Sequence, residues 1–140
     1  MRRFRLDGLP PGDPGPETVI RQVFWRLGDG WTLRLRREGP PDAAPTDTLA
    51  VRRPGAGWEF VLAAEPAAGL FRAGAGHRTV ATRRAYGPWT VLEYHWENEG
   101  LILATGTAAA PGWPDVTGQD AYEDESLAFR PFRDWAAPSR

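Results

Sequence analysis

The feature that most limits the fold of this 140-residue chain is its division into short apolar segments by glycine and proline turns. Eight such segments are predicted to be strands: residues 1–6, 18–27, 31–37, 48–53, 58–62, 78–86, 89–96 and 101–107. Several neighbouring segments are separated only by a few turn-forming residues, such as Gly28-Asp29-Gly30, which is typical of antiparallel hairpins. This spacing predicts a β-rich fold, either an antiparallel barrel or a sandwich.

Two segments have helical character. Glu65–Ala73 carries a proline in its first turn and is followed by glycines, which predicts a short mid-chain helix. Thr117–Ala128 is predicted to be a C-terminal helix with Thr117 as its N-cap. Residues 129–140 are expected to form a loose or docked tail, and residues 1–140 together are expected to form a single domain.

One predicted strand carries unusual charge. In Trp31–Arg37, Leu33 and Leu35 alternate with Arg34 and Arg36, the period-2 pattern of a strand with one apolar and one polar face. The polar face is either solvated, as arginine usually is, or turned into a barrel to meet an anion. The strand alone does not decide between these readings.

The composition limits the kinds of ligand and reaction to be expected of the chain. The formal net charge is -1, and every basic residue is an arginine, a planar fork suited to carboxylate or phosphate. This balance gives no reason to expect nucleic acid, and the chain has no apolar run long enough to span a membrane. Since there is no cysteine and no secretory segment, we expect a cytoplasmic protein without thiolate chemistry.

The order of segments resembles the CYTH, or triphosphate tunnel, family. The resemblance is carried by these stretches: Leu33-Arg34-Leu35-Arg36-Arg37, Leu49-Ala50-Val51-Arg52, Arg83-Arg84-Ala85-Tyr86, Trp89-Thr90-Val91, Gly100-Leu101-Ile102-Leu103-Ala104, Asp115-Val116-Thr117 and Leu127-Ala128. It implies a closed antiparallel tunnel of eight strands, and the expected fold adds to it the mid-chain and C-terminal helices predicted above. It also implies that inward arginine and lysine side chains bind triphosphate or polyphosphate, and that inward glutamates hold Mg²⁺ or Mn²⁺ for phosphohydrolysis or nucleotide cyclisation.

The chain departs from the family at the metal-binding positions. The opening pair of glutamates is missing, because the corresponding stretch is Met1-Arg2-Arg3-Phe4. The acidic pair after the seventh strand is replaced by Thr105-Gly106-Thr107. The acidic position of the sixth strand falls on Leu92, or on Glu93 if the register slips by one residue. Glu59 is the one family glutamate that is clearly retained. We therefore expect no metal ligands and no resident cofactor; the ions that the resemblance would imply are Mg²⁺ and Mn²⁺.

The family's positively charged positions are better preserved in this chain than its acidic positions. The implied ligand-binding residues are Arg34, Arg36, Arg52 and Arg84, with Arg83 as the alternative to Arg84. Buried arginines without counter-ions are strongly disfavoured. A bound anion, water in an open tunnel, or Glu59 is therefore expected to neutralise them.

Other polar residues have simpler readings. His95 and Glu93 share one face of a predicted strand and are the remaining candidates for proton transfer, provided that His95 points inward. His77 lies in a glycine-rich turn and is expected to be solvated. The Glu123-Asp124-Glu125 run is expected to be the solvated face of the last helix.

Three functions follow from these observations. The first is a tunnel protein that binds a small anionic, phosphorylated or nucleotide-like molecule and has lost the family's metal-dependent catalysis. The second is an enzyme acting on a small anionic substrate, with Glu59, Glu93 or His95 as catalytic residues. The third is a module that binds a protein partner. Whether the chain is an enzyme, and its oligomeric state, are left open.

Overall fold

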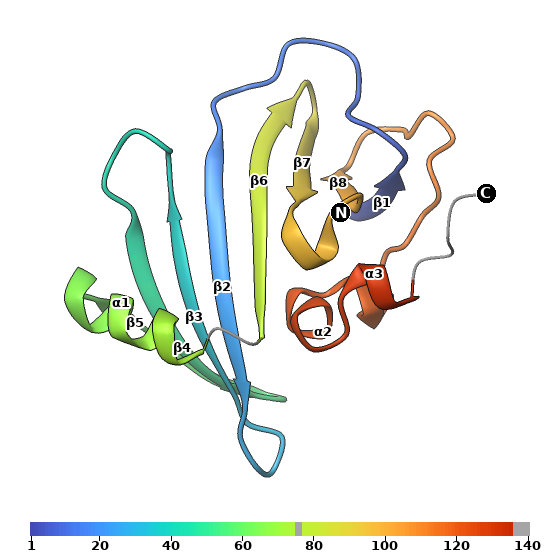
Figure 1. Ribbon diagram of the computed structural model, residues 1–140. Helices are drawn as coiled ribbons and strands as arrows, with labels where there is room; N and C mark the ends of the chain where they lie inside the picture. Colours follow the sequence, from blue (N-terminus) through green and yellow to red (C-terminus); the bar gives the residue numbers. More distant parts are fainter. Residues whose placement is uncertain (75–76, 136–140) are drawn as a thin grey trace.

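The computed structural model describes residues 1–74 and 77–135. Its strands are β1 (Arg2–Leu6), β2 (Thr18–Arg26), β3 (Thr32–Gly39), β4 (Thr46–Arg53), β5 (Ala56–Leu62), β6 (Arg78–Tyr86), β7 (Trp89–Tyr94) and β8 (Ile102–Gly106). Its helices are α1 (Ala64–Ala73), α2 (Asp124–Phe129) and α3 (Phe132–Trp135), with short 3-10 helices at Trp96–Asn98 (η1) and Asp120–Tyr122 (η2). All eight predicted strands and the mid-chain helix are therefore present (Figure 1).

The strands form one antiparallel sheet in the order β1-β8-β7-β6-β2-β3-β4-β5. The Asp29-Gly30 turn joins β2 to β3 with both residues at positive φ, 62° and 80°, as a tight hairpin requires. Among the described residues no ladder joins β1 to β5, so the predicted closure of the barrel is not confirmed. Turn signals specify local hairpins, whereas closure depends on a pairing between the two ends of the sheet, which no local pattern encodes.

The C-terminal region differs most from the prediction. Instead of one helix over Thr117–Ala128, η2 is followed by a break and then by the six residues of α2. Thr117 does not cap a helix, because its hydroxyl accepts a hydrogen bond from the backbone N–H of Arg3 at 2.8 Å. Part of the tail is docked: Phe132 is buried, and its N–H donates to Asn98 Oδ1 at 2.8 Å. Residues 136–140 of the predicted tail lie outside the described residues.

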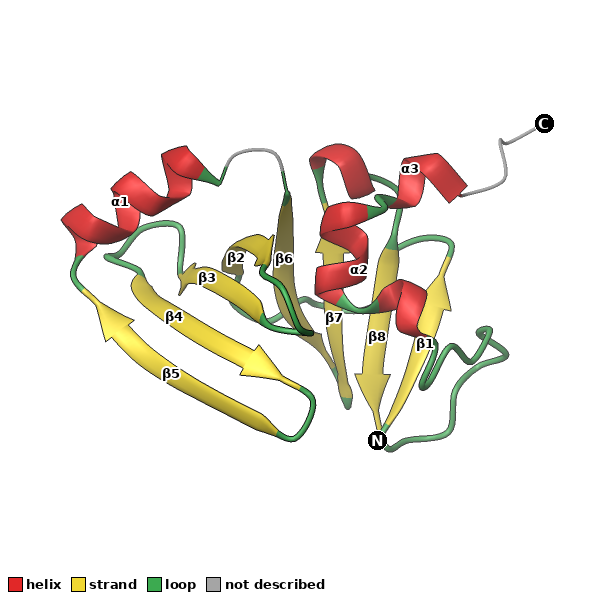
Figure 2. Ribbon diagram, turned by 90° about the horizontal axis from the view of Figure 1, so that it is seen from below, coloured by secondary structure: helices red, strands yellow, loops and turns green. Residues whose placement is uncertain are grey.

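Different helices cover the two faces of the sheet. On one face α2, η2 and α3 pack over β6, β7 and β8, and we call this the α2 face. Its apolar cluster consists of Ala81, Tyr94, Leu101, Leu103, Val116, Tyr122, Leu127 and Phe132. On the opposite face, α1 covers β2 and β3, and we call it the α1 face. Figure 2 shows α1 beside the β3–β5 side of the sheet and α2 across its β7–β8 side.

A second apolar cluster lies on the α1 face, at the end of the sheet that is formed by β6, β7, β8 and β1. It contains Phe4, Leu6, Tyr86, Trp89, Val91, Ile102 and Ala104, with Trp113 packed against it from the loop after β8. The indole ring of Trp113 is 5.2 Å from that of Trp89. Strands β6, β7, β8 and β1 are thus packed on both faces, whereas most of β5 is exposed.

Candidate functional site

Strand register gathers arginines on the α2 face. Arg34 in β3 is paired with Ala50 in β4, which is paired with Glu59 in β5, so all three side chains project from one face. Arg52 lies two residues from Ala50 and shares that face. The alternation of leucine and arginine in β3 therefore places Leu35 on the α1 face and Arg34 and Arg36 on the α2 face.

Arg34 is the most buried of these arginines, with 8% of the residue exposed. Its Nη2 lies 3.6 Å from Glu59 Oε1, and Arg52 Nη2 lies 3.7 Å from Glu59 Oε2. One carboxylate is thus shared by two guanidinium groups, at distances longer than a charge-assisted hydrogen bond. Burial, together with the charges of Arg52 and Arg36, lowers the pKa of Arg34.

The Arg34 guanidinium also keeps a free donor. Its Nε is fully buried and finds no acceptor in the described part of the chain. A buried donor without an acceptor is costly, and the cost is greater for a charged group. Arg34 is therefore a buried charged group whose hydrogen-bonding capacity the described residues do not fully meet.

Arg34 lies at one wall of a cavity of about 470 Å³, the α2 cavity. The cavity is lined on the sheet side by Gln22, Phe24, Thr32, Arg34, Arg52 and Arg53, and on the helix side by Glu123, Asp124 and Glu125. The acidic run is therefore not a solvated helix face, as its sequence suggested. Its carboxylates bind the protein: Glu125 accepts from Arg26 at 3.0 Å and from Thr32 at 2.9 Å, and Glu123 accepts from Arg3 at 3.1 Å.

Asp124 is held most firmly. Its two carboxylate oxygens accept from Tyr94 Oη at 2.6 Å and from Gln22 Nε2 at 2.8 Å. Burial first, and then the neighbouring Asp124 charge, raise the pKa of Tyr94 well above its ordinary value, so the hydroxyl remains a donor. This contact fixes the start of α2 above β2 and β7 and closes one side of the cavity.

A second pocket of about 450 Å³, the edge pocket, lies further along the same face. Glu38 bridges two arginines there, contacting Arg36 Nη2 and Arg83 Nη2, the latter at 2.9 Å. Burial raises the pKa of Glu38, but its hydrogen bonds to Arg83 and Arg36 and their charges outweigh that effect, so the pKa is lowered. Glu59 also lines this pocket. Unlike Arg34, these arginines have a close counter-ion.

The structure brings four of the seven predicted site residues to the α2 face, namely Arg34, Arg36, Arg52 and Glu59. Arg84 lies on the α1 face, where Nη2 pairs with Glu17 at 2.7 Å, and its neighbour Arg83 occupies the α2 face instead. The period of two along β6 makes this choice depend on a single residue of register.

Glu93 and His95 are also outside the arginine cluster. Glu93 lines a small pocket on the α1 face with Arg84 and Tyr86. Because β7 ends at Tyr94, whose side chain lies under α2, His95 falls beyond the strand and its Nε2 contacts Thr82 Oγ1 at 2.7 Å. The condition that His95 point inward is not met. His77 stacks on Phe129 with ring centroids 4.2 Å apart.

Two site residues were missed by the sequence predictions although a signal for each was present. Glu38 continues the alternation of Arg34 and Arg36 and would follow from extending the predicted strand 31–37 by one residue. Asp124 stands three residues before Leu127 and four before Ala128, the spacing of one helix face, so its burial could have been predicted from theirs.

The residues present do not fit the divalent metal that the tunnel family implies. Within residues 1–74 and 77–135, no group of three or more His, Cys, Asp or Glu side chains lies close enough together to hold an ion. Glu38 and Glu59 are each engaged with two arginines. A hard cation needs several free oxygen ligands, which this face does not offer.

Comparisons with known proteins identify the fold. No family model matches the chain, and no curated protein matches its sequence. A crystal structure of the inorganic triphosphatase NE1496 matches with a TM-score of 0.74 and 19% identity, covering 91% of this chain and 95% of that chain. Another crystal structure, described as the hypothetical protein NE1496, matches with a TM-score of 0.73 and 20% identity over the same shares.

The chain therefore has a triphosphatase-like tunnel fold, in agreement with the resemblance found in the sequence. At this identity the likeness concerns the backbone. None of the described helices has the length and apolarity needed to cross a membrane.

Proposed function

We propose that this protein binds a small anionic phosphorylated molecule in the α2 cavity, as a member of the triphosphate tunnel family. Arg34 and Arg52 hold the anion, Arg53 lines the same cavity, and Glu59 orients the two guanidinium groups. The proposal describes one domain, residues 1–140, acting in the cytoplasm. It is supported by the likeness in fold to a protein described as an inorganic triphosphatase.

One observation carries the proposal. Arg34 is buried, its Nε has no acceptor among the described residues, and it shares one distant carboxylate with Arg52. Arg36 and Arg83, in the neighbouring edge pocket, share Glu38 as a close counter-ion, whereas Arg34 has no carboxylate at hydrogen-bond distance among the described residues. Phosphate oxygens suit such planar forks because they accept paired hydrogen bonds.

We further propose that metal-dependent phosphohydrolysis or cyclisation has been lost. The support is that the carboxylates of the face are bound to arginine or to Tyr94 and Gln22. The proposal also gives Glu93 and His95 no catalytic role in this cavity, because they lie on the α1 face and beyond the end of β7.

Thermal unfolding tests the proposal with tripolyphosphate, pyrophosphate, ATP and citrate, each in magnesium and in chelator. A ligand at 100 times its Kd stabilises the native state by about 2.7 kcal/mol, so a phosphate compound should raise the melting temperature in chelator. Arg52→Gln should reduce that shift and Arg84→Gln, its match on the opposite face, should not. Stabilisation that requires magnesium, or turnover that Glu59→Ala abolishes, would overturn the loss of metal chemistry. The absence of any shift would overturn the binding site.

A further inference from the structure

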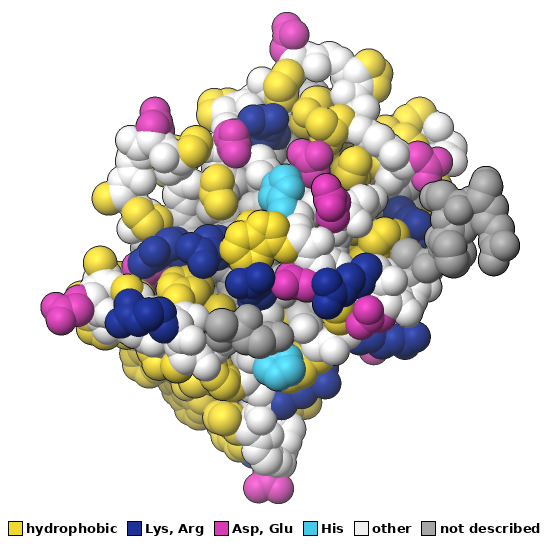
Figure 3. Space-filling view, in the orientation of Figure 1, with side chains coloured by type: hydrophobic (Ala, Val, Ile, Leu, Met, Phe, Trp, Pro, Cys, Tyr) yellow, Lys and Arg dark blue, Asp and Glu magenta, His cyan; other side chains and the backbone are white. Residues whose placement is uncertain are grey.

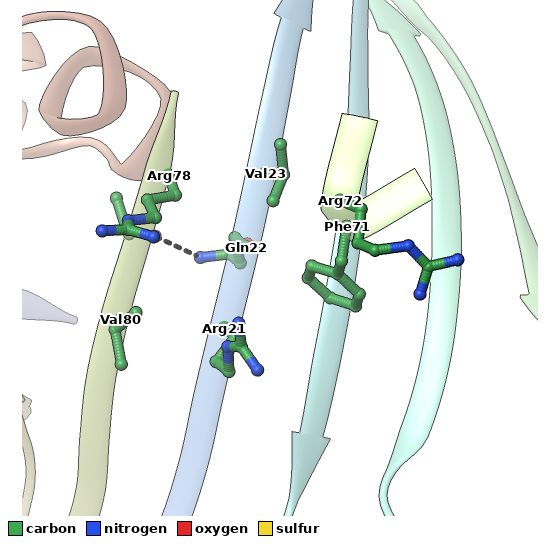
Figure 4. Close-up of a pocket in the computed structure, with 8 residues that line it drawn as sticks. Arg21, Gln22, Val23, Phe71, Arg72, Arg78 and Val80 are labelled. Atoms are coloured by element: carbon green, nitrogen blue, oxygen red, sulfur yellow. Dashed lines mark hydrogen bonds between the residues drawn. The ribbon is translucent and has the colours of Figure 1, made fainter. Parts of the chain in front are cut away.

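A third group of arginines surrounds a pocket on the α1 face, separate from the cavity proposed above. The pocket, of about 220 Å³, lies between α1, β2 and β6, and we call it the α1 pocket. Figure 4 shows Arg21 and Val23 on β2 between Arg78 and Val80 on β6 and Phe71 and Arg72 on α1. In Figure 3 the dark-blue groups, all arginine in this chain, form a band across this region of the surface.

Two of the three arginines have no acidic partner. The ion pairs of the described residues include neither Arg21 nor Arg72. The guanidinium carbon of Arg21 lies 5.3 Å from the centroid of the Phe71 ring, and that of Arg37 lies 5.0 Å from it. A cation–π contact of this kind uses the face of the guanidinium and not its N–H donors.

Arg78 is fixed from two sides and still has a free donor. Its Nη2 pairs with Glu97 Oε1 at 3.1 Å, and its guanidinium carbon lies 3.9 Å from the centroid of the Trp96 ring. Its Nε is buried and finds no acceptor among the described residues. The side chain is thus held in place, and one of its donors stays unsatisfied among the described residues.

The charge of the α1 pocket defines the ligand class. Three arginines face one glutamate, and the C-terminal end of α1 adds about half a negative charge, leaving about 1.5 positive charges. A phosphoryl group carries about -1.5 to -2 at neutral pH and has three acceptor oxygens. Val23, Val80 and Phe71 supply an apolar wall beside these donors.

We infer that the α1 pocket is a second anion site that binds a phosphoryl dianion at Arg21, with Arg78 on one side and Arg72 on the other. The dianion is either free phosphate or the phosphate of a small ester whose organic part contacts Phe71. This site shares no arginine with the α2 cavity, although Gln22 of β2 lines both.

The test is a titration of the arginine Nε–H resonances in ¹⁵N-labelled protein with inorganic phosphate and, separately, with phenyl phosphate. We expect saturable shifts of the Arg21, Arg72 and Arg78 resonances. Arg21→Gln and Arg72→Gln should each weaken the affinity about tenfold, the usual effect of losing a charge-assisted contact. Arg34→Met, in the α2 cavity, should leave it unchanged, and backbone amide spectra confirm that each variant is folded.

The two ligands distinguish the source of the phosphoryl group. Tighter binding of phenyl phosphate identifies an ester that uses the Phe71 wall, and equal binding identifies phosphate itself. Shifts that do not saturate, that spread evenly over all arginines, or that survive both Arg21→Gln and Arg72→Gln would overturn the site. Loss of these shifts in Arg34→Met would also overturn it, by assigning the binding to the α2 cavity.

Discussion

The two halves of the sheet differ in what covers their faces. In the packed half, formed by β6, β7, β8 and β1, apolar clusters lie on both faces, and α2, α3 and the Trp113 loop cover them. In the arginine half, formed by β3, β4 and β5, one face carries guanidinium and carboxylate groups, and Val61 at the free edge is 77% exposed. Strand β2 joins the halves and contributes to both.

This difference separates stability from recognition. Burial of apolar area is the main favourable term in folding, so the packed half should supply most of the stability. The arginine half has fewer buried apolar side chains and keeps a charged group, Arg34, in a buried position. A group held against its preference for water is expected where a ligand completes its environment.

The largest effect is expected in the packed half. Leu127 on α2 is fully buried, and Leu127→Ala should destabilise the protein by about 2–5 kcal/mol because it removes packed atoms and leaves a cavity. Val61→Ala in the arginine half should change stability by less than about 0.5 kcal/mol, because Val61 is mostly exposed. Urea unfolding measures both. Similar losses at the two positions would show that stability is not concentrated in the packed half.

The next effect concerns the contact that fixes α2. Tyr94→Phe removes the hydrogen bond to Asp124 and should cost about 1.5–3 kcal/mol, since the acceptor is charged and partly buried. Because the folded pKa of Tyr94 is raised, its contribution is complete below its ordinary value of 10.0 and is lost only as the pH rises through the folded value. Tyr86→Phe is the control, since its buried ring belongs to an apolar cluster. A loss for Tyr94→Phe no larger than that for Tyr86→Phe would contradict the role of the contact.

Replacing the buried arginine should have little effect on stability. Arg34→Met keeps the apolar stem and removes a desolvated charge beside two other arginines, so stability should be unchanged or raised by up to about 2 kcal/mol. Chemical denaturation without ligand provides the measurement. A loss as large as that of Leu127→Ala would mean that Arg34 is a structural ion-pair residue and would remove the distinction between the halves.

The smallest effect is a pH dependence in the edge pocket. The pKa of Glu38 is lowered, so its contribution is complete above the ordinary value of 4.5 and is lost as the pH falls through the folded value. Glu38→Gln should therefore lower stability at neutral pH by less than about 1 kcal/mol and flatten the decline below pH 4.5. Thermal unfolding from neutral to acid pH measures the slope. If the stability of Glu38→Gln declined with falling pH as steeply as that of the natural protein, the acid sensitivity would belong to other carboxylates.

The local elements were predictable because each leaves a local pattern. Turn residues and alternation placed β2 and β3 within two residues of their ends, and the proline and glycines around α1 fixed that helix. The break before α2 was not predictable in the same way. Thr117 is drawn to the N–H of Arg3, a contact between residues 114 positions apart that no helix signal reveals.

The site was predictable only in part, for a geometric reason. Alternation in β3 put Arg34 and Arg36 on one face, which the structure confirms. In β6 two adjacent arginines gave no such guide, so which of them projects from the α2 face depended on register, and it is Arg83 rather than Arg84. The pairing of Glu59 with two arginines and the approach of Asp124 to the cavity both required the tertiary arrangement.

The central claim is that the arginine half binds a phosphate compound without a metal. Isothermal titration calorimetry with tripolyphosphate in chelator tests it in the natural protein, in Arg34→Met and in Arg84→Met, the same change on the α1 face. We expect binding by the natural protein, an affinity reduced at least about tenfold in Arg34→Met, and no reduction in Arg84→Met. Equal binding by the natural protein and Arg34→Met, or an equal loss in both variants, would contradict the claim.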